Sequence, residues 1–313
     1  MKQIFVFLIA ITIFSCGKDK IKKDDPDTVV PGNFAEAKTE LNKIYGKDDN
    51  AAQVMDIYLP ANRSTSSTNV ILLVHGGAWI AGDKNGNDDD PYIKILLDSV
   101  RKRYPDWAIF NMNYRLASGN PITGTNAKNI FPTQEDDVAT AVKYIYDNRQ
   151  AFGISDKWVF MGMSAGAHLV MLQAYKSDNG APIRPKVVVD FYGPTDMADL
   201  YNFYNDEGEV LGRNGIKMLL GDNTPSSNAQ LYSRNSPINA VNAQAPPTLI
   251  LHGGNDDTVP ERQSLALRDK LKNLSVKVEF VAGLKEQTHG WSSPDSWAKS
   301  MKSIQDFLTA NVP

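Results

Sequence analysis

The chain has 313 residues, of which 42% are hydrophobic, and its 33 basic and 36 acidic residues leave a net charge of −3. This apolar content is too high for a disordered chain, and the balanced charge excludes the basic footprint expected of a nucleic-acid-binding protein. One cysteine and four histidines exclude a disulfide framework and leave little room for a metal centre, so neither a metal nor an organic cofactor is expected.

The first residues have the pattern of an export signal. Lys2 precedes an apolar run over residues 4–14, which is too short for a bilayer that needs about 20 residues but suits a secretory signal. The run ends in Ser15-Cys16-Gly17, which resembles a bacterial lipobox. We therefore expect a lipoprotein signal peptide over residues 1–15, lipidation of Cys16, and a membrane-anchored protein facing the periplasm or the cell surface. The alternative is an ordinary cleaved signal beside an incidental cysteine.

Residues 16–33 are charged and rich in proline and glycine, with almost nothing to bury, which predicts a solvated tether. From residue 34 to residue 313, short apolar runs alternate with helical periodicity, which is typical of an α/β protein with a mostly parallel sheet. The predicted strands cover residues 55–59, 70–74, 107–113, 158–161, 187–191, 248–251 and 276–281. The predicted helices cover residues 92–103, 134–149, 165–175, 261–274 and 296–308.

The alternation of apolar runs and helical periodicity stops over residues 196–245, a polar, turn-rich stretch that contains several tyrosines. We expect an irregular, lid-like insertion within the single domain. A surface excursion packed by its own aromatic residues is an equally acceptable interpretation. Neither a repeat nor a second domain boundary is apparent.

The motif Gly162-Met163-Ser164-Ala165-Gly166 lies between a predicted strand and a predicted helix. This is the setting that a G-x-S-x-G nucleophile elbow requires, because the glycines allow a tight turn that lifts the serine hydroxyl clear of the sheet. The amides at the start of the following helix point toward any anion that develops there. The motif predicts that Ser164 is a nucleophile.

A second glycine-rich motif, His75-Gly76-Gly77-Ala78-Trp79, ends an earlier buried strand. An HGGG-type loop in this position supplies backbone N–H groups to an oxyanion hole. On its own the motif could be a simple turn. Together with the elbow, in this order, it predicts an acyl-transfer site.

The remaining partners follow from chain order, which in this architecture runs serine, acid, histidine. Only His289 lies beyond the late strands, in a loop before the last helix; the other three histidines, His75, His168 and His252, are interpreted as structural. The acid is expected in the loop after His252, where Asp256 and Asp257 compete. Two acids after the preceding strand, Asp190 and Asp196, are the fallback.

Several motifs carry a resemblance to a known family. They are the two glycine motifs, Asn113-Tyr114-Arg115-Leu116, Phe131-Pro132 through Asp137, His168-Leu169, Tyr192-Gly193-Pro194-Thr195-Asp196 and Ser236-Pro237. From about Tyr45 onward the chain resembles the α/β-hydrolase superfamily, and within it the hormone-sensitive-lipase-like esterases and above all the BD-FAE group of carbohydrate esterases. The family's acid motif, D-x-x-V-P, fits Asp256 through Pro260 and favours Asp256 over Asp257.

The resemblance implies an α/β-hydrolase fold and a serine carboxylesterase that removes short acyl groups, acetyl or feruloyl, from polysaccharides. Ser164, His289 and Asp256 would form the triad, and the backbone N–H groups of Gly77, Ala78 and Ala165 the oxyanion hole. The partners would be an acylated carbohydrate or small ester and, through the anchor, a membrane. A general carboxylesterase or an arylformamidase is the main alternative. A prolyl oligopeptidase-like peptidase and a non-catalytic glycan-binding lipoprotein are weaker ones.

Overall fold

The computed structural model describes residues 34–47, 52–86, 91–120, 122–176, 180–281, 284, 286–291 and 293–312. The predicted signal peptide over residues 1–15, its Cys16 and the tether over residues 16–33 lie outside these residues. Among the helices that the structure describes, none combines the length and the apolar character that crossing a membrane would require.

The molecule is built around one eight-stranded sheet in the order β1-β2-β4-β3-β7-β8-β9-β10, with a separate hairpin of β5 and β6. The edge pairs β1–β2 and β2–β4 are antiparallel, and the other neighbours are parallel. The strands are β1 (Lys38–Ile44), β2 (Val54–Leu59), β3 (Val70–Val74), β4 (Ala108–Met112), β5 (Ser118–Asn120), β6 (Thr125–Lys128), β7 (Trp158–Met163), β8 (Val187–Phe191), β9 (Thr248–Leu251) and β10 (Val278–Phe280). The predicted α/β-hydrolase fold is confirmed.

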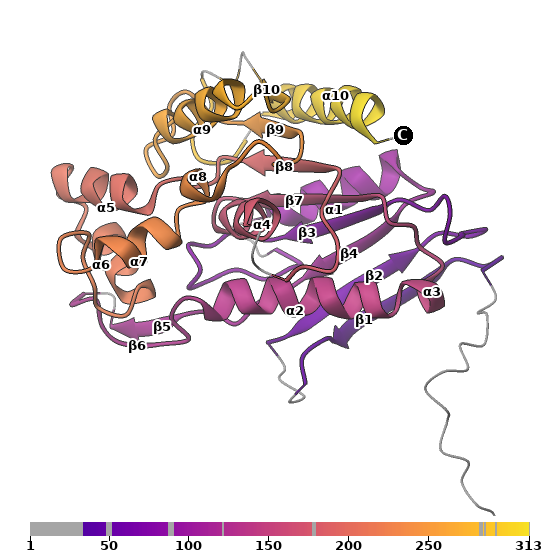
Figure 1. Cartoon of the computed structure of the whole chain (residues 1–313), viewed down its shortest axis with the longest axis horizontal. Coiled ribbons are helices and arrows are strands. Elements are labelled where there is room, and N and C mark those ends of the chain that lie inside the picture. The colour runs from indigo at the N-terminus through magenta and orange to yellow at the C-terminus, as the bar shows by residue number, and fades with distance from the viewer. Residues whose placement is uncertain are drawn as a thin grey trace, which may run out of the picture. The chain divides into compact units, whose positions relative to one another are not determined.

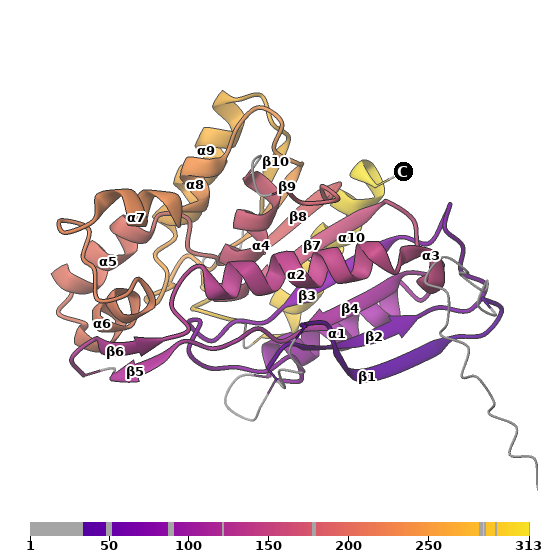
Figure 2. The same ribbon diagram turned by 60° about the horizontal axis from the view of Figure 1, so that its bottom comes forward.

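Helices cover both faces of the sheet, as Figures 1 and 2 show. One hydrophobic cluster packs α1 and α10 against one face, and the other packs α2, α4 and α9 against the opposite face. The central strands β3, β4, β7, β8 and β9 are buried along their whole length, which explains why their sequences are predominantly apolar. The helices are α1 (Tyr92–Arg103), α2 (Thr133–Asp147), α3 (Arg149–Phe152), α4 (Ala165–Tyr175), α5 (Met197–Asp206), α6 (Val210–Leu219), α7 (Ala229–Arg234), α8 (Pro237–Ala240), α9 (Arg262–Asn273) and α10 (Pro294–Asn311).

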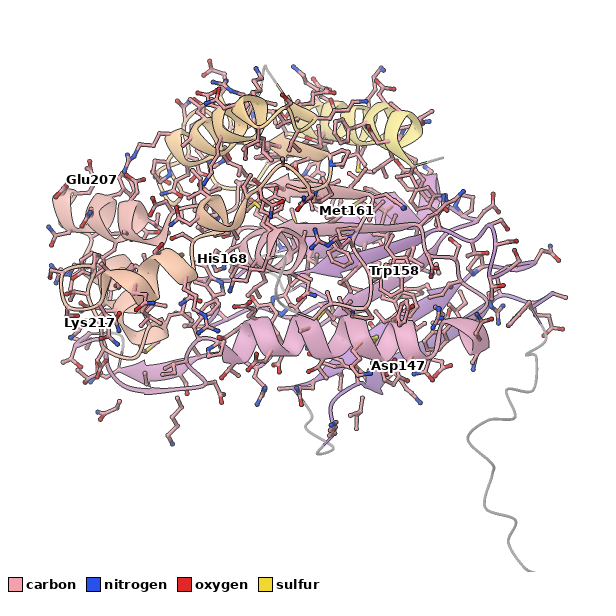
Figure 3. All side chains as sticks on the ribbon, viewed as in Figure 1. Asp147, Trp158, Met161, His168, Glu207 and Lys217 are labelled. Atoms are coloured by element: carbon pink, nitrogen blue, oxygen red, sulfur yellow. The ribbon has the colours of Figure 1, made fainter. Side chains whose placement is uncertain are left out.

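The expectation of an irregular segment over residues 196–245 is wrong in its secondary structure, since four short helices, α5 to α8, lie there. Figure 1 places α5, α6 and α7 together beyond the end of the sheet toward which β8 points. In Figure 3, Glu207 and Lys217 mark this group, well apart from Trp158 and Met161 of β7. The helices escaped prediction because they are at most ten residues long and α6 contains Gly212 and Gly215, which weaken its helical pattern.

Three strands were also not predicted. The edge strand β1 lacks the alternation of apolar and polar residues that marks a strand, because nearly all of its side chains are exposed. The strands β5 and β6 are only three and four residues long. The role of residues 196–245 as a lid stays a prediction, as does the division of the chain into signal, tether and domain.

Candidate active site

The turn between β7 and α4 holds Ser164 in a conformation that few residues adopt, with φ 52° and ψ −119°. The flanking glycines allow the backbones to approach closely. A Cβ on Gly162 would lie 2.4 Å from the carbonyl of Gly166, and a Cβ on Gly166 would lie 2.2 Å from the carbonyl oxygen of Val74. The elbow therefore depends on glycine at both positions, and it presents the Ser164 side chain at the carboxyl ends of the central strands.

Ser164, His289 and Asp256 are joined by hydrogen bonds, although Ser164 and His289 lie 125 residues apart in the chain. The Ser164 hydroxyl lies 2.9 Å from His289 Nε2, and His289 Nδ1 lies 2.8 Å from Asp256 Oδ2. An ionised carboxylate only accepts hydrogen bonds, so Nδ1–H donates to Asp256 and Nε2 is left to accept from the serine. This arrangement can draw the proton from the Ser164 hydroxyl.

Asp256 is buried but well supplied with donors. Its Oδ1 accepts hydrogen bonds from the amides of Thr258 and Val259, and its Oδ2 lies 3.2 Å from His252 Nε2 as well as close to His289. Burial by itself would raise the pKa of Asp256, but the hydrogen bonds and positive charge that His252 and His289 can provide outweigh it and hold that pKa well below its ordinary value. Asp256 is therefore a carboxylate at neutral pH.

The other candidate acids lie elsewhere. Asp257 is exposed and accepts a hydrogen bond from the Thr258 hydroxyl, and Asp196 accepts hydrogen bonds from the amides of Ala198 and Asp199 as the N-cap of α5. Asp190 is fully buried at the end of β8, where its Oδ1 accepts from the amide of Gly193. Of the four carboxylates, the structure brings only Asp256 to His289.

Two loops converge to make this contact. In the loop after β9, the amides of Gly254 and Asn255 donate to the carbonyls of Leu284 and Gln287 in the loop that carries His289. A Cβ on Gly253 would lie 2.3 Å from the carbonyl oxygen of Gln287, so the approach requires glycine there. Backbone hydrogen bonds thus hold the loop that carries Asp256 against the loop that carries His289.

The glycine loop after β3 runs through three consecutive residues with positive φ: Gly77 at 101°, Ala78 at 50° and Trp79 at 63°. The backbone N–H groups of Gly77, Ala78 and Ala165 have no acceptor among the residues that the structure describes. Unpaired amides beside a serine hydroxyl can stabilise negative charge that develops on a bound carbonyl oxygen. Gly77 and Ala78 line the same cavity as Ser164, and Ala165 follows Ser164 directly in the chain, so these three amides stay the predicted oxyanion donors.

The glycine loop after β3 is held in place by contacts with aromatic and histidine side chains. His75 stacks on Tyr114 with ring centroids 4.4 Å apart, and the Tyr114 hydroxyl donates to the carbonyls of His75 and Gly76. The indole N–H of Trp79 donates to Nδ1 of His168, whose Nε2–H donates to the carbonyl of Asn235. Burial lowers the pKa of His168 to about 3, so this ring is neutral at neutral pH. It links Trp79 of the glycine loop to Asn235, the C-cap of α7.

Two cavities meet at Ser164. The first, which we call the His289-side cavity, has a volume of about 410 Å³ and is lined by Ser164 and His289 together with Gly76, Ile93, Met163 and Tyr192. The second, the α6-side cavity, has a volume of about 240 Å³ and is lined by Ser164 and Trp79 together with Leu200, Leu211, Gly215 and Ile216. Of the described residues, His289 lines the first cavity and not the second.

Sequence reasoning missed two neighbours of the site. The interpretation of His252 as structural leaves out its contact with Asp256; its place four residues before that acid is the signal that could have found it. Tyr192 packs edge-on against the His289 ring at 4.7 Å, and nothing local to its sequence predicts this contact. Within the described ranges, no group of three histidine, cysteine or acidic residues could hold a metal ion.

Comparison with known proteins finds relatives named as ester and formamide hydrolases. The chain is 26% identical over 255 residues to a probable carboxylic ester hydrolase, LipM, of Mycobacterium tuberculosis; the match covers 78% of this chain and 54% of LipM. It is also 27% identical over 213 residues to kynurenine formamidase avaC of Aspergillus versicolor, covering 62% of this chain and 72% of that enzyme. The chain thus spans about half the length of the LipM relative.

A solved structure of a truncated carbohydrate esterase from gut microbiota superimposes with a TM-score of 0.68 at 23% identity, covering 90% of this chain and 99% of that one. This likeness supports the fold. The BD-FAE family model matches residues 55–271, which is more than half of the chain. With the predicted elbow and glycine loop inside the matched range, the chain belongs to the BD-FAE family.

Proposed function

We propose that this protein is a serine carboxylesterase that hydrolyses short acyl esters through an acyl-enzyme. The observation that carries the proposal is the unbroken series of hydrogen bonds from Ser164 through His289 to Asp256, beside unpaired backbone amides. Its family membership and the names of its relatives support ester hydrolysis as the reaction class.

In the first step, the Ser164 oxygen attacks the ester carbonyl carbon while His289 Nε2 takes the hydroxyl proton. Asp256 stabilises the imidazolium that forms and keeps its Nδ1–H oriented. The carbonyl oxygen becomes an oxyanion that accepts hydrogen bonds from Gly77, Ala78 and Ala165, each worth about 3 kcal/mol in comparable sites. The C–O bond to the alcohol then breaks, and His289 returns the proton to the departing oxygen.

In the second step, His289 takes a proton from a water molecule, which attacks the acyl-enzyme at the same carbon. The oxyanion forms a second time at the same amides, and collapse returns the proton to Ser164 and releases the carboxylic acid. The charged state of Asp256 serves both steps, because each one passes through a protonated His289.

For the substrate, we propose acyl groups on polysaccharides, acetyl or feruloyl, hydrolysed by an exported protein anchored through Cys16. The support is the sequence pattern around Cys16 and the likeness to a structure named as a carbohydrate esterase. Acetylated and feruloylated oligosaccharides, with the released acids identified by chromatography, test the substrate. Metabolic labelling with a fatty-acid analogue, compared with Cys16→Ser, tests the anchor; equal labelling of the two would contradict it.

The central test is the substitution Ser164→Ala. The parent should release a burst of p-nitrophenol from p-nitrophenyl acetate and gain the mass of a fluorophosphonate adduct, and Ser164→Ala should lose both. Ser226→Ala, at an exposed turn, is the matched control and should behave as the parent. Undiminished turnover in Ser164→Ala would refute the assignment.

A second candidate, arylformamidase activity, is favoured by the likeness to the kynurenine formamidase of Aspergillus versicolor. The same serine and oxyanion donors would serve a formamide, whose acyl group is a single formyl carbon. Comparison of kcat/KM for an aryl formamide with that for the matching aryl acetate decides between the two. A higher value for the formamide would favour this second candidate.

A further inference from the structure

We propose that the α6-side cavity receives the acyl group of the ester and selects apolar acyl groups larger than acetyl. This inference rests on the proposed serine-esterase function and concerns the same reacting centre; of the two acyl groups proposed above, it disfavours acetyl. It makes Gly215, in the middle of α6, a specificity-determining residue.

The assignment of sides follows from the tetrahedral intermediate. Its carbon carries four groups: the Ser164 oxygen, the oxyanion, the leaving oxygen and the acyl chain. The oxyanion lies at the amides of Gly77, Ala78 and Ala165, and the leaving oxygen must lie near His289 Nε2 to take up its proton. Since His289 lines the first cavity and not the second, the leaving alcohol belongs in the His289-side cavity. The α6-side cavity is then the space that remains for the acyl chain.

The lining of the α6-side cavity suits an apolar chain. Leu200, Leu211 and Ile216 contribute aliphatic side chains, and Trp79 contributes an aromatic ring. The hydroxyl of Tyr204, which also lines it, already donates to the carbonyl of Thr258. A polar acyl group would therefore lose hydrogen bonds to water and find few replacements.

The cavity is also larger than an acetyl group needs. Its volume is about 240 Å³, and a dry apolar cavity of about 150 Å³ in another protein accepts benzene. An acetyl methyl group would leave most of this space unfilled. An acyl chain of roughly the size of a benzene ring, or somewhat longer, would bury more apolar surface in the transition state.

Helix α6 keeps this space open. Glycine inside a helix is unfavourable, yet α6 has two in ten residues. Gly212 has a packing reason, because a Cβ there would lie 2.8 Å from the Tyr204 ring. Gly215 has none, because a Cβ there would meet no atom within 4 Å. Four residues earlier, on the same face of the helix, Leu211 leaves 63% of its surface exposed at the cavity edge.

The test uses p-nitrophenyl acetate, butyrate and hexanoate, which vary only the acyl group, and a set of acetates that varies only the alcohol. In the parent, kcat/KM should rise from acetate to butyrate or hexanoate. Gly215→Leu should lower the ratio of hexanoate to acetate by about tenfold or more, as one methylene too many does in an apolar pocket. The dependence on the alcohol should stay unchanged.

The matched control is Arg213→Leu, which adds the same side chain elsewhere on α6, at a residue that does not line the cavity. It should keep the parent's acyl profile. Gly215→Ala, which favours the helix, should shift the profile in the same direction by a smaller factor, and it tests the proposal if Gly215→Leu fails to fold.

The outcomes separate the two proposals. If no ester is hydrolysed, or if hydrolysis survives Ser164→Ala, the serine-esterase function fails and this inference fails with it. If hydrolysis depends on Ser164 but the parent prefers acetate, or if the Gly215 variants alter the alcohol profile instead of the acyl profile, the esterase stands and the cavity assignment is wrong.

Discussion

Two carboxylates near the ends of neighbouring strands, Asp190 in the last residues of β8 and Asp256 in the loop after β9, are both buried but lie in opposite surroundings. Asp256 accepts two backbone hydrogen bonds and one from His289, and its pKa is held below the ordinary value. Asp190 accepts one bond from the amide of Gly193, and no partner for its Oδ2 exists among the described residues. Burial therefore raises the pKa of Asp190 to about 7.

The difference teaches that burial does not by itself decide the charge of a carboxyl group; the number of donors around it does. A carboxylate with several donors can stabilise an imidazolium beside it, as the proposed mechanism requires of Asp256. A carboxyl group with one donor is best accommodated as a neutral acid. Asp190 therefore has a structural role, even though its position along the chain made it an acceptable candidate.

The largest expected effect is on catalysis. Asp256→Asn should lower kcat by about 10⁴-fold, because the amide no longer holds His289 in the required tautomer. Asp190→Asn, the matched change near the end of the neighbouring strand, should leave kcat close to that of the parent. Steady-state hydrolysis of p-nitrophenyl butyrate measures both. Equal losses in the two variants would remove the distinction between the carboxylates.

A smaller effect is expected from the glycine that lies near each acid. Gly253→Ala places a Cβ against the backbone of Gln287 and should push the acid and histidine loops apart, lowering kcat by about 10²-fold. Gly193→Ala places a Cβ 2.7 Å from Asp190 Oδ1 and from the Ala167 side chain, which should lower thermal stability with little change in kcat. A normal kcat in Gly253→Ala would show that the loop contact does not position His289.

The smallest effect concerns stability against pH. Because the pKa of Asp190 is raised, the folded protein keeps a proton between about pH 4 and pH 7 that the unfolded chain has released. Asp190 therefore stabilises the fold at low pH, and this contribution is lost as the pH rises through 7. Asp190→Asn should remove a slope of at most about 1.4 kcal/mol per pH unit in the free energy of unfolding.

Asp256, with its lowered pKa, contributes in the opposite sense, and its stabilisation is lost only as the solution becomes strongly acidic. Urea unfolding of the parent and Asp190→Asn at several pH values between 4 and 8 gives the two slopes. If the two proteins lose stability in parallel over this range, Asp190 is already ionised in the folded state.

Much of the fold could be predicted from local pattern. The strand over residues 70–74 and the helices over residues 92–103 and 165–175 have the bounds expected, because continuous apolar runs and helical periodicity directly reflect burial. The helices of residues 196–245 could not, because they are short and their stability comes from packing on one another and on α4.

The sequence by itself determined the fold class, the elbow around Ser164 and the glycine loop around Gly77, because these depend on backbone conformations and close approaches that only particular residues allow. The acid motif already favoured Asp256 over the other carboxylates. Only the tertiary structure showed that His252 contacts Asp256 and that two cavities meet at Ser164. The physical reason is that the walls of each cavity come from segments far apart in the chain, which only long-range packing brings together. The His252–Asp256 contact spans four residues, but it depends on the conformation that the loop after β9 adopts in the fold.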